Sequence, residues 1–206
     1  HEKLQARNDP RDAVYFKPNK DQEAIEFAPN GNQTQVQGRF GLSGITTNTA
    51  PTYLLSYHEV EFLKAEAYAR QGAGSLADAK IALEKAIIAA FTKSNVGFTT
   101  EEAEEYFDER IAGRLTTPEA ALNEIMVQKY LAFYEEEAIE AYNDYRRLRA
   151  MGDNFIQLNN PLNVNMFPHR FTYGSSDVTT NENIRDAYGD GTYVYSERVW
   201  WAGGTR

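Results

Sequence analysis

The stretch YHEVEFLKAEAYARQGAGSLADAKIALEKAIIAAF, residues 57–91, decides the fold of this 206-residue chain. Its first half carries apolar residues at helical spacing, at Tyr57, Val60, Leu63 and Ala67. The pattern stops at Gly72, which suits the position just after a helix end. Its second half follows Ser75, a helix-capping residue type, and carries a second stripe at Leu76, Ala79, Leu83, Ala86, Ile87 and Ala90. The stretch therefore predicts two antiparallel helices joined by a tight turn.

This helix pair resembles the tetratricopeptide pattern, in which small residues let two helices pack closely. The matching segments are AEAYARQG (65–72) and ADAKIALEKAI (77–87). One such unit cannot bury both of its faces, so the pair predicts neighbouring helices and a surface for a partner.

Two further helical stretches follow the pair. TTEEAEEYFDERIAG (99–113) begins with Thr99 or Thr100 as its capping residue. Residues 116–152 begin with a predicted capping box between Thr116 and Glu119. Their apolar face runs through Leu122, Ile125, Met126, Tyr130 and Phe133. Glu135–Glu137 then interrupt this face, and the pattern fits either two helices or one kinked helix.

The two ends of the chain differ from its middle. Residues 1–52 and 151–206 are rich in turn chemistry, so both are predicted to be mostly irregular around helical residues 53–150. Short strands are predicted at 13–16 and 35–41, a short helix at 181–189, and an extended segment at 192–201. The fold class predicted for 1–206, taken as one domain, is mainly α: tetratricopeptide-like antiparallel helices wrapped by long irregular loops.

Composition excludes several classes of protein. A net charge of −9 disfavours nucleic acid, whose binding needs clustered cations. The absence of Cys excludes thiolate chemistry, and no apolar run is long enough for a membrane span. Glu59 and Glu66, about 10 Å apart on a helix, are too far apart for a retaining glycosidase and marginal for an inverting one. The alternative is a helical ion pair between Glu66 and Arg70. No motif indicates an enzyme.

The segment DAYGDGTYVYSE (186–197) raises the question of calcium. Asp186, Asp190 and Glu197 occupy positions 1, 5 and 12 of an EF-hand loop, but Tyr188 replaces the oxygen ligand at position 3. The alternative is a helix that ends at Gly189 and a glycine turn into an extended segment. No other cofactor is indicated.

Several blocks together resemble the SusD/RagB family of outer-membrane nutrient-binding lipoproteins, specifically a SusD-like subgroup. Beside YHEVEFLKAEAYARQG, these are RNDPRDAVYF (7–16), QKYLAFYEEEAIEAYNDYRRL (128–148), NNPLNVNMFPHRFTYGSSDVTTNENI (159–184) and RVWWAGG (198–204). They occur in the family's order over nearly the whole chain. Members of this family are much longer and carry further tetratricopeptide-like helices before this region, so the resemblance implies that the chain is the C-terminal part of such a protein.

The resemblance implies a surface-exposed outer-membrane lipoprotein that captures oligo- or polysaccharide and delivers it to a SusC-like TonB-dependent transporter, without catalysis. Its membrane contact would be a lipid anchor on a preceding N-terminal part. It also implies that Trp200 or Trp201 packs on the helical region, and that Arg146, Arg147 and Arg170 form structural ion pairs. The rival interpretation is a tetratricopeptide-like protein-interaction scaffold without sugar binding.

Aromatic residues are the candidates for sugar contact, because a pyranose ring offers an apolar face to a side-chain ring. The candidates on the irregular N-terminal segment are Tyr15, Phe16, Arg39 and Phe40. Tyr193 and Tyr195 form a second group near the C-terminus. The alternative for each of these residues is that it anchors irregular chain to the helices.

Overall fold

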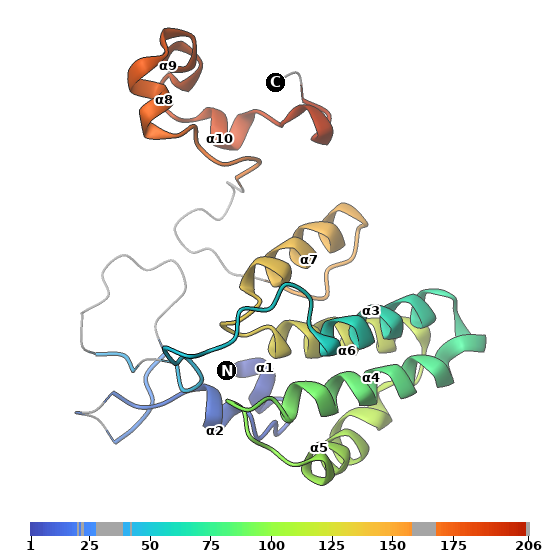
Figure 1. Ribbon diagram of the computed structural model, residues 1–206. Helices are drawn as coiled ribbons and strands as arrows, with labels where there is room; N and C mark the ends of the chain where they lie inside the picture. Colours follow the sequence, from blue (N-terminus) through green and yellow to red (C-terminus); the bar gives the residue numbers. More distant parts are fainter. Residues whose placement is uncertain (20, 22, 28–38, 42, 158–167, 205–206) are drawn as a thin grey trace. The chain divides into compact units, whose positions relative to one another are not determined.

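The computed structural model describes residues 1–19, 21, 23–27, 39–41, 43–157 and 168–204 (Figure 1). Two compact units make up the chain: residues 1–28 with 35–157, and residues 29–34 with 158–206. The described residues contain no strand, only an isolated antiparallel bridge between Phe16 and Ser43. The predicted mainly helical class is confirmed.

The first unit is built from seven α-helices within its described residues. They are α1 (Glu2–Gln5), α2 (Asp12–Tyr15), α3 (Tyr57–Arg70), α4 (Leu76–Phe91), α5 (Thr100–Tyr106), α6 (Pro118–Ala132) and α7 (Ala138–Ala150). Short turns of other helix types, η1 (Ala73–Ser75), η2 (Phe107–Ile111) and η3 (Ala112–Arg114), connect some of them.

Helices α3 and α4 form the predicted antiparallel pair (Figure 1). Gly72 follows the end of α3 with a φ of 99°, a value that suits glycine and lets the chain reverse in a few residues. The stripe predicted for α4 is buried at Ala79, Leu83, Ala86, Ile87 and Ala90. Helix α6 packs against both members of the pair, and α5 packs against α4.

The buried face of α3 differs from the predicted stripe. Tyr57 is 62% exposed and Leu63 is 43% exposed, whereas the fully buried side chains are Phe62, Ala65 and Ala69. The prediction was wrong because Glu59, Glu61 and Glu66 are also buried, so polarity does not mark the solvent side of this helix.

The interruption at Glu135–Glu137 separates two helices, α6 and α7, rather than kinking one. Glu135 has a φ of 66°, a left-handed conformation that breaks the helical hydrogen-bond ladder. The predicted Thr116–Glu119 capping box is wrong by one residue, because the Oγ1 of Thr117 accepts the N–H of Ala120 at 3.1 Å. At α5, the capping box is formed by Thr99 and Glu102.

The strand predicted at 13–16 is a helical turn, α2. The N–H of Tyr15 donates to the carbonyl of Arg11 at 2.8 Å, a local bond that replaces strand pairing. The side chain of Arg11 is fully buried and fixes this segment to the helices. Residues 35–38 of the other predicted strand lie outside the described residues.

The described part of the second unit contains α8 (Ser175–Thr180), α9 (Glu182–Tyr188), α10 (Tyr193–Ser196) and the 3-10 turn η4 (Trp200–Ala202). Helix α9 matches the predicted 181–189 helix. The predicted extended segment at 192–201 is wrong at Tyr193–Ser196, because the N–H of Glu197 bonds to the carbonyl of Tyr193 at 2.9 Å and closes a helical turn. Glu197 and Val199 do have extended backbone conformations.

The prediction that Trp200 or Trp201 packs on the helical region stays a prediction, although Trp200 itself is 70% exposed. The side chain of Trp201 lies outside the described ones.

Candidate ligand-binding surface

Two of the predicted N-terminal candidates belong to a cluster of stacked rings. Tyr15 stacks on Tyr134 with their centroids 4.8 Å apart, and Phe16 contacts Tyr134 edge-on at 5.4 Å. Phe27 meets Phe16 at 5.1 Å and stacks on the ring of His1 at 3.9 Å. Tyr15 is 1% exposed, whereas Phe27 is 39% exposed. Tyr15 therefore anchors the cluster, and Phe27 forms part of its open side.

The other two candidates, Arg39 and Phe40, lie beside each other. The guanidinium of Arg39 is 5.9 Å from the centre of the Phe40 ring, and its Nε donates to the carboxylate of Glu26. Glu26 precedes Phe27, so this ion pair connects the two groups of candidates. We call the surface formed by Phe16, Phe27, Arg39 and Phe40 the aromatic edge.

Sequence reasoning missed three members of this cluster: His1, Phe27 and Tyr134. Tyr134 lies in the junction between α6 and α7, 119 positions after Tyr15 in the sequence. No local sequence pattern can predict a contact between residues so far apart. Composition gives no signal for them, because Tyr15, Phe16 and Phe27 are the only Phe, Tyr or Trp among residues 1–27, a share no higher than the 13% of the whole chain.

A buried polar network holds the N-terminal segment against the helices. The carboxylate of Asp9 accepts two bonds from the guanidinium of Arg11, at 2.9 and 2.6 Å, and one from the hydroxyl of Tyr106 at 2.8 Å. Arg11 Nη2 also donates to Gln128 Oε1 on α6 at 2.7 Å, and the Phe91 ring lies 4.5 Å from its guanidinium carbon. We call these residues the N-terminal lock.

Charge pairing makes burial of this network possible. Burial acts to raise the pKa of Asp9, but the Arg11 charge and the hydrogen bonds outweigh it and hold that pKa below its ordinary value. Beside it, the guanidinium of Arg7 makes two bonds to Glu124, at 2.7 and 2.8 Å. These residues position the aromatic edge rather than offer groups to a ligand.

A second network joins α3 to α7. Arg147 donates to both oxygens of Glu66, at 2.7 and 2.8 Å, and to Asp144 at 2.9 Å. Arg70 bonds Glu66 at 2.8 Å, which confirms the predicted helical pair, and its other end bonds Asp153. We call these residues the helix lock. With all its oxygens engaged by arginines, Glu66 is a structural residue.

Arg146 and Arg170 differ from their predicted ion-pairing role. Arg146 lies 5.7 Å from the Tyr142 ring centre and donates to its hydroxyl. In the second unit, the Arg170 guanidinium lies 4.8 and 5.2 Å from the ring centres of Tyr173 and Tyr193. Both contacts are with aromatic rings, a preference of the planar guanidinium.

The C-terminal candidates lie within the second unit. Tyr193 is 5% exposed, stacks on Tyr173 at 5.2 Å, and accepts the N–H of Tyr173 at 2.8 Å through its hydroxyl. Tyr195 is half-buried. The contacts of Tyr193 are those of a packing residue, which was the alternative interpretation for it.

The calcium candidates are placed around the turn before α10. Asp190 accepts the N–H and the hydroxyl of Thr192, at 3.0 and 2.7 Å, and these bonds lower its pKa. Within the described parts of the chain, no three His, Asp or Glu side chains are grouped to hold a metal ion. Asp186, Asp190 and Glu197 are therefore not gathered as in an EF-hand.

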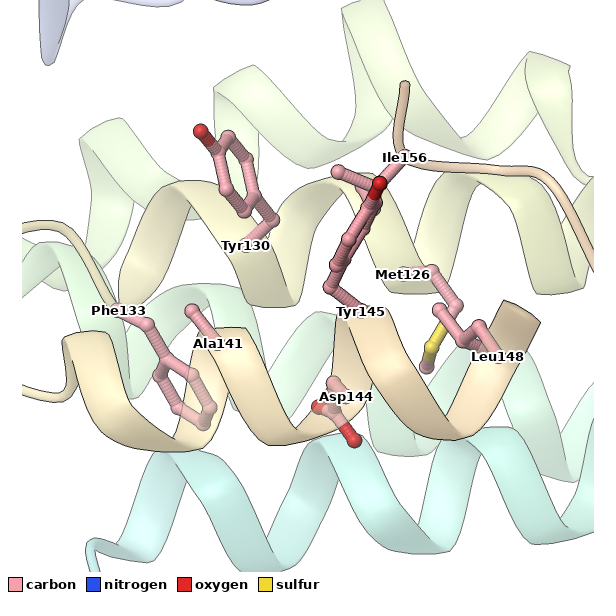
Figure 2. Close-up of a pocket in the computed structure, with 8 residues that line it drawn as sticks. All are labelled: Met126, Tyr130, Phe133, Ala141, Asp144, Tyr145, Leu148 and Ile156. Carbon is pink, nitrogen blue, oxygen red and sulfur yellow. The ribbon is translucent and has the colours of Figure 1, made fainter. Parts of the chain in front are cut away.

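A small cavity between α6 and α7 is too small for a sugar. Figure 2 shows the side chains that line it: Met126, Tyr130, Phe133, Ala141, Asp144, Tyr145, Leu148 and Ile156. Its volume of about 10 Å³ is at most the room of one water molecule. Asp144 at its border pairs with Lys129 at 2.7 Å. The cavity is a gap in packing.

These features define a helical scaffold in which buried charged residues form structural networks and several aromatic rings gather in the N-terminal segment. Among the described residues, no helix combines the length and apolarity that crossing a membrane requires. A family model described as SusD-like, starch-binding associating with outer membrane, matches residues 1–174. The chain belongs to this SusD/RagB family.

A solved structure gives the same assignment. The chain is similar to a SusD/RagB family protein from Bacteroides thetaiotaomicron VPI-5482, with 39% identity and a TM-score of 0.80. The match covers 100% of this chain and 49% of that chain, so this chain spans about half the length of that relative. None of the curated proteins compared is significantly similar to it.

Proposed function

We propose that this chain is part of a surface lipoprotein that binds oligo- or polysaccharide and delivers it to a SusC-like TonB-dependent transporter in the outer membrane. Membership of a family described as starch-binding and associated with the outer membrane supports this proposal. The observation that carries it on the chain itself is the aromatic edge, which combines the exposed ring of Phe27 with the half-buried ring of Phe40 beside the exposed guanidinium of Arg39.

The chemistry of the aromatic edge suits a carbohydrate. The ring of Phe27 offers an apolar face for the C–H groups of a pyranose. The half-buried ring of Phe40 contacts Arg39, which pairs with Glu26, the residue before Phe27. Arg39 is 57% exposed at its side chain and has donors for sugar hydroxyls. Binding rather than catalysis is proposed, because the acidic groups of the two locks are already engaged by arginines.

The rival function, a protein-interaction scaffold, is favoured by a different observation. Leu54, Leu55 and Tyr57, before and at the start of α3, are 99%, 64% and 62% exposed. Exposed apolar residues in a run are typical of protein-binding surfaces. This surface also suits the transporter partner of the main proposal, so it does not by itself decide between them.

Calorimetric titration of the 206-residue chain with maltoheptaose, an α-1,4-glucan, tests the proposal. We expect saturable binding that weakens about two- to tenfold in Phe40→Ala, the scale of one lost aromatic contact. Phe171→Ala is the matched control, because Phe171 is 85% exposed and lies in the other unit. An unchanged affinity in Phe40→Ala would remove the aromatic edge from the site. No binding of maltoheptaose, cellohexaose or xylohexaose would favour the scaffold.

A further inference from the structure

An open cleft lies at the other end of α6 from the aromatic edge. It is lined by Thr117, Glu119, Ala120, Asn123, Asn154 and Phe155, and its volume is about 450 Å³. Helix α6 has 15 residues and is therefore about 22 Å long. Tyr134 of the aromatic cluster follows its C-terminal end, so the cleft is a separate place on the first unit.

The polar groups of this cleft are not used by the fold. Glu119 and Asn123 are four residues apart on α6 and therefore share one face of the helix. Asn154 approaches from the segment that follows α7. In the part of the chain that the structure describes, none of these three side chains has a hydrogen-bond partner. By contrast, the side-chain oxygen of Thr117 already caps the helix.

The wall opposite α6 is held in place from both sides. Asp153 is bonded to Arg70 at 2.8 Å, and its N–H bonds the carbonyl of Leu148 at 2.9 Å. Ile156 is 5% exposed and packs into the core between α6 and α7 (Figure 2). Asn154 and Phe155 therefore lie between two anchored residues, and a ligand would not have to order them on binding.

The residue types of the cleft select the class of ligand. No Lys or Arg lines it, so it offers no cation for a phosphate or a carboxylate, and Glu119 would repel an anion. A single carboxylate is too few for a metal site. Two amides, a carboxylate and the half-buried ring of Phe155 together match an uncharged ring compound with several hydroxyls.

We infer that this cleft is a second saccharide subsite, which takes one sugar unit with its apolar face on Phe155 and its hydroxyls on Asn123, Asn154 and Glu119. This inference rests on the proposed function and adds a site at a distance from the aromatic edge. A volume of about 450 Å³ falls within the range of small-molecule sites.

The test follows the side-chain amide signals of ¹⁵N-labelled chain by NMR while maltoheptaose is added. We expect the Asn123 and Asn154 NH₂ signals to shift and saturate, and the Asn143 signal to stay in place. Asn143 is an exposed helical asparagine on α7 and serves as the matched control. In calorimetry, Asn123→Ala and Asn154→Ala should each weaken binding about two- to tenfold, and Asn143→Ala should not.

The outcomes separate this inference from the proposed function. If maltoheptaose binds and Phe40→Ala weakens it while the Asn123 and Asn154 signals do not move, the cleft is not a subsite and the proposed function stands. If the chain binds none of maltoheptaose, cellohexaose and xylohexaose, both are overturned. If the Asn123→Ala chain shows no thermal unfolding transition, it is not folded and its loss of binding carries no information about the cleft. The shifts of the Asn123 and Asn154 signals in the wild-type chain then decide.

Discussion

At the scale of single residues, the clearest feature is that buried charge is matched group by group. Asp9, Arg11, Tyr106 and Gln128 are all buried, and each has at least one partner among the other three. A buried polar group without a partner costs more free energy than a paired one returns. The N-terminal lock is therefore sensitive to removal of any one of its groups.

Tyr106→Phe tests this sensitivity. The change removes a hydroxyl that donates to Asp9 at 2.8 Å and accepts from Gln128 at 3.0 Å. We expect the free energy of unfolding to fall by about 1–2 kcal/mol in urea denaturation. Tyr68→Phe on α3 is the control, because the Tyr68 hydroxyl has no hydrogen-bond partner in the described part of the chain. Equal losses in the two variants would contradict a role for the lock.

At the scale of elements, short junctions decide how the helices follow one another. Gly72 at the α3–α4 turn has a φ of 99°, and a Cβ added there would meet nothing within 4 Å. Gly113 in η3 also has open space around it, but its φ is not positive. The two positions therefore differ in backbone conformation and not in crowding.

Replacing each glycine by alanine should have opposite effects. Gly72→Ala should lower the free energy of unfolding by about 1–2 kcal/mol, because an L-residue is strained at positive φ. Gly113→Ala should be neutral or stabilise by up to about 1 kcal/mol, because it restricts the unfolded chain. Thermal and urea denaturation measure both. Destabilisation of similar size at the two sites would indicate crowding instead of backbone strain.

At the scale of the whole molecule, acidic residues are held ionised in several parts of the first unit. Burial acts to raise the pKa of Glu66, but bonds from Arg147 and Arg70 lower it below the ordinary 4.5. For Glu137, burial is likewise outweighed by its bonds to His58 and Ser56. Asp9 behaves in the same way. The pKa of Glu59 shifts in the other direction, because burial raises it above the ordinary value.

These shifts predict loss of stability in acid. A carboxyl group with a lowered folded-state pKa stabilises the fold above its unfolded value and loses this effect as the pH falls through the folded value. We expect the free energy of unfolding to decrease below about pH 4.5. Glu66→Gln should be less stable at pH 7, and its difference from wild type should shrink toward pH 3.

Urea denaturation from pH 7 to pH 3 measures both chains. Glu109→Gln is the control, because the Glu109 side chain is 56% exposed and pairs only loosely with Arg110 at 3.5 Å. If the free energy of unfolding of Glu66→Gln is as far below that of wild type at pH 3 as at pH 7, the contribution of Glu66 is not electrostatic.

The amino-acid sequence by itself determined the helical class, the α3–α4 pair and the family. The apolar stripe of α4 and the glycine at position 72 act within a few residues along the chain, where hydrogen bonding and backbone conformation are local. For the same reason, α9 and an interruption at Glu135–Glu137 were predictable, although the sequence left open whether it separates two helices or kinks one. The role of Tyr15 and Phe16 in sugar contact stays a prediction, and only the structure shows that Tyr15 is buried.

Only the tertiary structure decided which side chains are brought together. Arg11 and Gln128 are 117 residues apart, as are Arg7 and Glu124, and Arg147 meets Glu66 across 81 residues. These pairings engage the buried Glu66 of α3 and fix the segment around α2 to α6. Their free energy depends on burial and charge matching between distant segments, which a local pattern does not contain.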